Sequence, residues 1–138
     1  FTMRIGMVTI NDAQHTFAFD PTPFLSGNKP IKYYGGFIHM HTLGKSARLF
    51  IQRGGDVADE DCLMDIPNYD FNWQSGVRFM EPKILNPGDR LVIQCNWDNT
   101  LDNQVQVDGV PLPVKDVNWG DGTTDEMCLG VMYATIED

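Results

Sequence analysis

The alternation of apolar and polar positions along the chain predicts a series of short β-strands. Clusters of Gly, Pro, Asn and Asp bound these runs about every 8–12 residues, the spacing typical of sandwiches and barrels. No stretch longer than about one turn shows the helical period of about 3.6 residues. We therefore predict an all-β fold, an antiparallel, jelly-roll-like β-sandwich that forms a single domain over residues 1–138. The expected strands cover residues 1–10, 15–19, 32–43, 46–53, 69–74, 77–85, 90–97 and 127–136.

Three of these segments carry more specific predictions. Residues 90–97 (Arg-Leu-Val-Ile-Gln-Cys-Asn-Trp) follow an Asn-Pro-Gly-Asp turn and form the clearest buried strand. Pro82 interrupts residues 77–85, and since proline cannot donate a ladder hydrogen bond, this strand is expected at a sheet edge or a bulge. The alternating aromatic run at 69–74 predicts a half-buried strand. Strands are not expected in the proline-containing stretch 20–30, the acidic stretch 54–67 or the irregular connection 104–117.

Composition and charge narrow the classes of partner. Hydrophobic residues make up 42% of the chain, which is enough to bury one core. The net charge is −9 and the ten Lys and Arg residues are scattered, so neither a nucleic acid nor an anionic membrane is an expected partner. No apolar run approaches the roughly 20 residues of a membrane-spanning helix.

The strongest candidate for chemistry is the pair His39 and His41 around Met40. In a β-strand, residues two apart share a face and can bind one metal ion together. In a helix the same two side chains would point about 200° apart. Two imidazoles leave a first-row metal ion unsaturated, so a third ligand is expected from elsewhere in the chain.

The third ligand is either His15, the one remaining histidine, or a residue of another type. His15 is equally compatible with an ordinary edge histidine. Met127 follows a polar loop at the start of an apolar strand, and a thioether favours Cu(I) over zinc or calcium. Methionine is also common core packing. The three cysteines, Cys62, Cys95 and Cys128, permit one internal disulfide and one free thiol, and their spacing does not select the pair.

Four segments, in this order, resemble the C-terminal catalytic domain of the copper type II, ascorbate-dependent monooxygenases. They are His-Met-His-Thr-Leu-Gly-Lys at 39–45, Tyr-Asp-Phe-Asn-Trp-Gln at 69–74, Pro-Gly-Asp at 87–89 and Thr-Asp-Glu-Met-Cys at 124–128. The resemblance covers the chain from near residue 1 to about residue 135. It implies that His39, His41 and Met127 bind the copper where dioxygen is activated. It also implies a disulfide between Cys95 and Cys128, with Cys62 unpaired.

The function implied by this resemblance is hydroxylation of a C–H bond in a small-molecule or peptide substrate. One copper would cycle between Cu(I) and Cu(II), with electrons from an external reductant such as ascorbate or from a second copper domain. The family binds that second copper through three histidines of a preceding domain, and here only His15 is left over. A copper–thioether site with a disulfide suggests a secreted or periplasmic protein.

Departures from the family pattern concern the substrate. The peptide-amidating members have an arginine two positions before the first ligand histidine, where this chain has Phe37. Their substrate-contacting asparagine and tyrosine correspond to Leu129 and Val131. A peptidylglycine substrate is therefore not expected, and an apolar or differently anchored one becomes the alternative. Two rival hypotheses are a stand-alone mononuclear copper protein without monooxygenase turnover and a metal-free β-sandwich interaction module.

Overall fold

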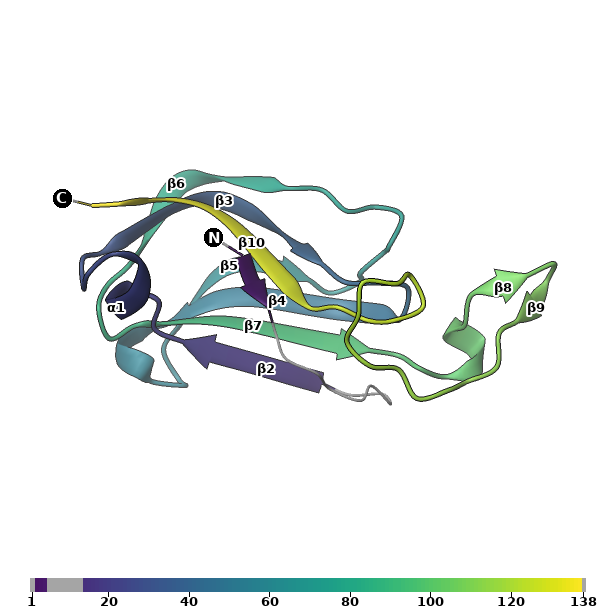
Figure 1. Ribbon diagram of the computed structural model, residues 1–138. Coiled ribbons are helices and arrows are strands. Elements are labelled where there is room, and N and C mark those ends of the chain that lie inside the picture. The colour runs from purple at the N-terminus through teal and green to yellow at the C-terminus, as the bar shows by residue number, and fades with distance from the viewer. Residues whose placement is uncertain (1, 5–13, 138) are drawn as a thin grey trace.

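The computed structural model describes residues 2–4 and 14–137, which form two facing four-stranded sheets (Figure 1). The first sheet has the order β1-β10-β3-β6 and the second β2-β7-β4-β5, and all strand pairings are antiparallel. The prediction of an all-β sandwich is confirmed, and this strand order is that of a jelly roll. The strands are β1 (Thr2–Arg4), β2 (Gln14–Phe19), β3 (Ile31–His39), β4 (Gly44–Gln52), β5 (Glu60–Ile66), β6 (Val77–Leu85), β7 (Arg90–Trp97), β8 (Gln106–Val107), β9 (Val110–Pro111) and β10 (Leu129–Ile136).

Helical structure in the described residues is limited to single turns. They are α1 (Thr22–Leu25) and two 3-10 turns, Arg53–Gly55 and Leu101–Asn103. The helix α1 lies inside the stretch expected to be a loop, and a proline in its first turn suits a helix start. None of these helices is long and apolar enough to cross a membrane. The small β8–β9 hairpin projects from the end of the sandwich where β7 finishes (Figure 1).

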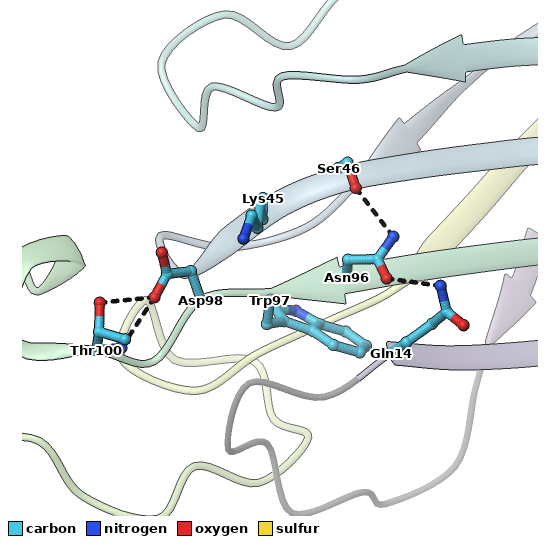
Figure 2. A pocket seen from close by; sticks show the side chains of 7 residues that line it. All are labelled: Gln14, Lys45, Ser46, Asn96, Trp97, Asp98 and Thr100. Atoms are coloured by element: carbon cyan, nitrogen blue, oxygen red, sulfur yellow. Dashed lines mark hydrogen bonds between the residues drawn. The ribbon is translucent and has the colours of Figure 1, made fainter.

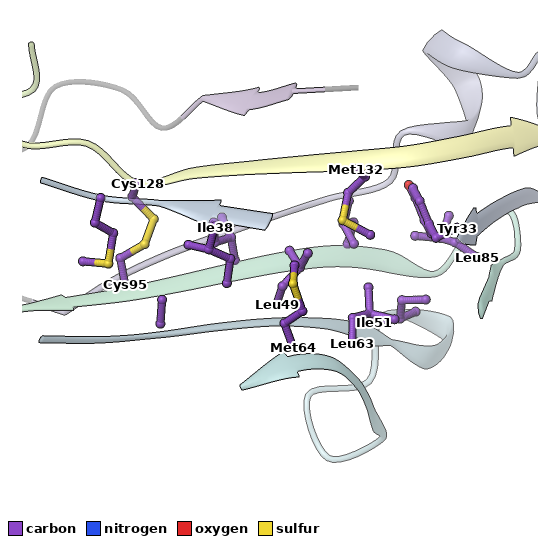
Figure 3. Close-up of a cluster of buried hydrophobic side chains, with 14 of the residues drawn as sticks. Tyr33, Ile38, Leu49, Ile51, Leu63, Met64, Leu85, Cys95, Cys128 and Met132 are labelled. Carbon is purple, nitrogen blue, oxygen red and sulfur yellow. A yellow bond between two sulfur atoms is a disulfide. The ribbon is translucent and has the colours of Figure 1, made fainter. Parts of the chain in front are cut away.

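The hydrophobic core lies between the two sheets (Figure 3). The centre of the second sheet is formed by β7 and β4, and Leu91, Ile93, Leu49 and Ile51 are fully buried. Each such side chain contributes roughly 1.5–3 kcal/mol relative to an exposed one. The prediction of a buried strand at 90–97 is therefore confirmed, because β7 is a central strand and its residues 91–93, 95 and 97 are all buried.

The edge strands show where the sequence pattern succeeded and where it failed. Pro82 lies in β6, which is an edge of the first sheet, and the β3–β6 register shifts between Tyr33 and Gly35. That prediction is confirmed. The acidic stretch 54–67, expected to lack a strand, contains β5 at the edge of the second sheet. Its charges are those of a solvent-facing edge, while Leu63 and Met64 are buried against the core.

Three further strand predictions need correction. The connection 104–117, expected to lack strands, contains the short β8–β9 hairpin. Residues 69–74 form a loop and turn instead of a half-buried strand, and Trp73 is 80% exposed. Its alternating aromatic residues serve the end of the first sheet, as described below, rather than a sheet of their own. The strand expected at 127–136 begins at Leu129. Of the first strand expected at 1–10, Thr2–Arg4 is confirmed as β1, and 5–10 lie outside the described residues.

An ion-pair cluster fastens the end of the sandwich at which β4 finishes. The Arg53 guanidinium donates to the Asp89 carboxylate at 2.8 Å and also pairs with Asp61. Burial alone would raise the pKa of Asp89, but the backbone N–H groups of Gly54 and Asn86 and the Arg53 guanidinium outweigh it, so this pKa is lowered. The ionised carboxylate is therefore the form that the folded state favours.

The lowered pKa of Asp89 predicts acid sensitivity. A carboxyl group with a lower pKa in the folded state stabilises the fold above its unfolded pKa, here 3.8, and loses that contribution as the pH falls further. We expect Asp89→Asn to lower the free energy of unfolding by about 1–3 kcal/mol at neutral pH. The difference from wild type should shrink as the pH falls below 3.8. Urea denaturation at several pH values tests this, and a difference that does not depend on pH would contradict it.

Candidate metal centre

The two histidines lie at the end of β3, with their ring centroids 5.0 Å apart. The strand predicted to contain both ends at His39, so His41 lies beyond it. Residues 40–43 lead into a turn that the Gly44 N–H closes by donating to the His41 carbonyl at 3.2 Å. The prediction of one continuous strand face is therefore wrong for His41, although the two rings do come together.

Tyr69 takes the place of a strand partner just beyond the end of β3. Its hydroxyl accepts the Met40 N–H at 2.9 Å and donates to the Met40 carbonyl at 2.8 Å. Burial raises the pKa of Tyr69 to about 12, so the hydroxyl stays protonated and serves as donor and acceptor at once. The loop 69–76 is thereby attached to the backbone between the two histidines.

Glu126 holds the rest of this segment. Its carboxylate has no exposed surface, and Oε2 accepts the backbone N–H groups of His41 at 2.9 Å and Met127 at 3.3 Å. Oε2 also accepts the Trp97 indole N–H at 3.0 Å, and Oε1 accepts the Leu43 N–H at 2.6 Å. Burial raises the pKa of Glu126 more than these four donors lower it. One carboxylate thus joins the His41 turn, the start of the last strand and the end of β7.

Hydrogen bonds fix the tautomers of both imidazoles. His39 Nδ1 lies 2.6 Å from Gln74 Oε1, and His41 Nδ1 lies 3.0 Å from the Asp125 carbonyl oxygen. The Gln74 amide is oriented because its Nε2 donates to the Phe71 carbonyl at 2.8 Å. Amide oxygens only accept, so each Nδ1 carries the proton and each Nε2 keeps its lone pair. This is the arrangement of metal-binding histidines, whose second nitrogen is held by an outer acceptor.

The backbone of Met127 lies beside the backbone of His41, beyond the paired ends of β3 and β10. The β3–β10 register pairs His39 with Leu129, so Met127, two residues earlier, continues toward His41. Both backbone N–H groups reach the same Glu126 oxygen, as described above. The Met127 side chain is 8% exposed. The structure therefore places the two imidazoles together and the Met127 backbone beside that of His41.

The structure also places the three cysteines and His15. Cys95 and Cys128 form a disulfide, with Cα atoms 6.0 Å apart, and Cys62 is free, as the sequence resemblance implied (Figure 3). His15 lies in β2 of the second sheet, opposite Cys95. Within residues 2–4 and 14–137, no three His, Cys, Asp or Glu side chains are grouped as metal ligands. His15 is therefore not grouped with His39 and His41.

Comparison with known proteins identifies the family. The family model described as copper type II ascorbate-dependent monooxygenase, C-terminal domain, matches residues 10–136. The chain belongs to this family. Among curated relatives, DBH-like monooxygenase protein 1 of Mus musculus is 32% identical over 78% of this chain. Putative DBH-like monooxygenase protein 2 of Homo sapiens is 30% identical over 75% of it, and DBH-like monooxygenase protein 2 of Mus musculus 33% identical over 67%.

This copper monooxygenase domain corresponds to a small part of each relative. The matches cover 16%, 18% and 13% of the three relatives' own lengths. Family membership implies a copper cofactor, and the residues present fit that metal. Two imidazoles with free Nε2 atoms and one thioether are softer than the oxygen ligands that suit magnesium, calcium or manganese, and a thioether favours Cu(I).

Several residues of the monooxygenase site were not predicted from the sequence. Glu126, Tyr69 and Gln74 lie in the four segments that resemble the family, but their hydrogen-bond partners are far away in the sequence. Phe71 also belongs to the site, because its ring meets the His41 ring edge-on at 6.2 Å. Of these residues, only Glu126 could have been noticed in the sequence. It directly precedes an apolar strand, and an acidic side chain that is buried there needs hydrogen-bond partners.

A polar pocket of about 470 Å³ occupies the same end of the domain but belongs to the second sheet (Figure 2). In it the Asn96 side chain accepts from Gln14 and donates to Ser46. Trp97 also lines this pocket, and its indole N–H reaches Glu126. The pocket contains neither candidate histidine, so it is a hydrogen-bonded flank of the copper monooxygenase site rather than a part of it.

Proposed function

We propose that this chain is the catalytic copper domain of a C–H-hydroxylating monooxygenase, and that it binds one copper through His39 Nε2, His41 Nε2 and Met127 Sδ. The observation that carries the proposal is the hydrogen bonding of the two imidazoles. Each Nδ1 is directed at an oxygen that can only accept, which leaves both Nε2 atoms for a metal. The shared Glu126 oxygen supports the third ligand, because it places the Met127 backbone beside that of His41.

When bound, copper supplies the redox chemistry that activates dioxygen. The protein residues supply the geometry. Glu126 and Tyr69 hold the backbone of the ligand-bearing turn, while Gln74 and the Asp125 carbonyl fix the imidazole orientation. Met127 favours the reduced metal. Three protein ligands leave a position open for a small molecule, and no side-chain base is needed in this scheme.

The electrons have to come from outside this site. With His39 and His41 assigned, His15 is the one histidine left in the chain, so a second three-histidine copper site cannot be formed from these residues. We propose an external reductant such as ascorbate, or a second copper domain, as the donor. The Cys95–Cys128 disulfide supports an oxidising location, and we propose that the protein is secreted or periplasmic.

Copper titration tests the proposed function. We expect the metal-stripped, reduced chain to bind one Cu(I), with a sulfur contribution in X-ray absorption that Met127→Ala abolishes. His39→Ala should lower the affinity by about a hundredfold, since loss of an outer partner alone costs about 10–100-fold. His15→Ala is the matched control and should bind like wild type. If no stoichiometric copper binds, or if His39→Ala binds like wild type, the copper monooxygenase assignment fails.

The outer partner of His39 gives a second prediction. We expect Gln74→Ala to lower the Cu(I) affinity by about tenfold, because the ring loses the acceptor that fixes its tautomer. Gln74→Glu keeps an acceptor and should retain the affinity. The exposed neighbour Ser75→Ala serves as the control for the loop. Equal Cu(I) affinity in all three variants would show that the Gln74 contact does not orient His39.

A further inference from the structure

The outward face of the first sheet has a groove close to the strand position of His39. In the β3–β10 ladder, His39 is paired with Leu129 and Phe37 with Val131. Cross-strand partners point to the same side of a sheet, and residues two apart along a strand share that side. Phe37 and Val131 therefore lie on the face that carries His39. Phe37 is two residues further from the end of β3 than His39.

The groove next to these residues has a volume of about 440 Å³ and includes Phe37 and Val131 in its lining. Small-molecule sites usually have volumes of about 300–1,000 Å³. Gly35 and Gly36 also line it, and a Cβ at either would collide with the carbonyl oxygen of Val77 or Val131. The two glycines therefore let the neighbouring strands approach closely.

The far end of the groove is aromatic. Tyr34 and Tyr133 line it, and their ring centroids are 5.5 Å apart. Together with Phe37 they offer flat apolar surface, which suits an aromatic or aliphatic body. The groove therefore offers little to anchor a polar chain along its length.

Arg78 is the only charged residue among the described side chains that line the groove. It comes from β6, where it is paired with Gly35, and it takes part in none of the ion pairs of the described residues. A guanidinium presents a planar fork of donors that matches a carboxylate. Gly35 and His39 are four residues apart on β3, a span of about 13 Å.

We propose that this groove binds an arylalkyl carboxylate, with the carboxylate on Arg78 and the apolar body along Phe37 and Val131 toward His39. The inference rests on the proposed function for its chemistry, because it names the substrate class of the same copper site. The anchoring charge lies on β6, opposite Gly35 of β3. The length of the groove favours a substrate whose reacting carbon lies several bonds from its carboxylate.

Ligand binding to the metal-free chain tests the groove without copper. We would titrate 4-phenylbutanoate and follow the methyl NMR signals of Val77 and Val131, with 4-phenylbutanamide and 4-phenylbutylamine as neutral and cationic matches. We expect the carboxylate to bind about tenfold more tightly than the amide, the effect of a charge-assisted hydrogen bond. Arg78→Gln should abolish this ratio. Arg90→Gln, at an exposed position of the second sheet, should leave it unchanged.

Equal affinity for the carboxylate and the amide, shifts confined to other methyl groups, or a ratio that survives Arg78→Gln would overturn the proposal. Loading with Cu(II) then tests the substrate assignment separately from the proposed copper site. Broadening of the phenyl signals of the bound probe would support a groove that leads to the metal. If copper binds without such broadening, the substrate assignment is wrong while the copper site stands. If copper does not bind, the proposed function fails, and the affinity ratio alone decides whether Arg78 anchors a carboxylate.

Discussion

Replacing Glu126 by alanine is expected to lower the free energy of unfolding by about 3–5 kcal/mol. The carboxylate is fully buried and accepts four N–H donors, three of them from backbone groups that have no strand partner at this point. Alanine would leave these donors unpaired inside the protein and would also open a cavity. Urea denaturation of the metal-free chain measures the effect. Asp125→Ala is the matched control. Among the residues that the structure describes, its side chain accepts only the Gly122 N–H, at 3.1 Å, so the variant should cost less than about 1 kcal/mol.

A second variant at this position distinguishes a positioning role from a purely structural one. Glu126→Gln can keep the three bonds to Oε2 but places an amide N–H₂ against the Leu43 N–H, so we expect an intermediate loss of stability. Trp97→Phe removes one donor to the same oxygen without touching the ligand backbone. If Glu126 positions the ligands, Glu126→Gln should weaken Cu(I) binding more than Trp97→Phe does. Parallel losses in the two variants would assign Glu126 to stability alone.

Removal of the disulfide is the second large effect. The double variant Cys95→Ala/Cys128→Ala should be less stable by about 3–4 kcal/mol, as expected for a cross-link that closes a loop of this length. The two cysteines are 33 residues apart, and the bridge joins β7 to the segment just before β10. Because Cys128 is adjacent to Met127, we also expect weaker Cu(I) binding in the double variant.

The measurement is urea denaturation of the metal-free protein with and without a thiol reductant. The reductant should lower the stability of wild type and leave the double variant unchanged. Cys62→Ala is the control, since Cys62 is free and exposed, and it should respond to the reductant as wild type does. Wild-type stability that is indifferent to the reductant would contradict the prediction.

The fold was predictable from the sequence where burial dominates. The strand at Arg90–Trp97 has a continuous apolar run because it is central, and Pro82 marks an edge because an edge strand can lack a donor. The pattern failed at β5, where edge charges resembled a loop. It also failed at 69–74, where alternating aromatic residues pack around the site instead of forming a strand.

The candidate site was predictable only in part, for a physical reason. His39 and His41 stand out because two imidazoles two residues apart on a strand can bind one metal ion, and Met127 became a candidate ligand through the resemblance to the family. The end of β3 at His39 depends on Glu126, which is 85 residues from His41, and on Tyr69. Contacts over such sequence distances leave no local periodicity. The four donors of Glu126 therefore required the folded structure.

The hydrogen bonds from Glu126 and Tyr69 to the ligand turn also bear on whether folding or copper binding comes first. In a zinc finger the metal creates the fold, and the protein without metal is unfolded. Here protein groups alone secure the turn, so we expect the chain to fold and form its disulfide without copper. Copper would then bind to a site whose backbone is already in place. Its loss would be reversible and would remove only the stability that ligand binding adds by mass action.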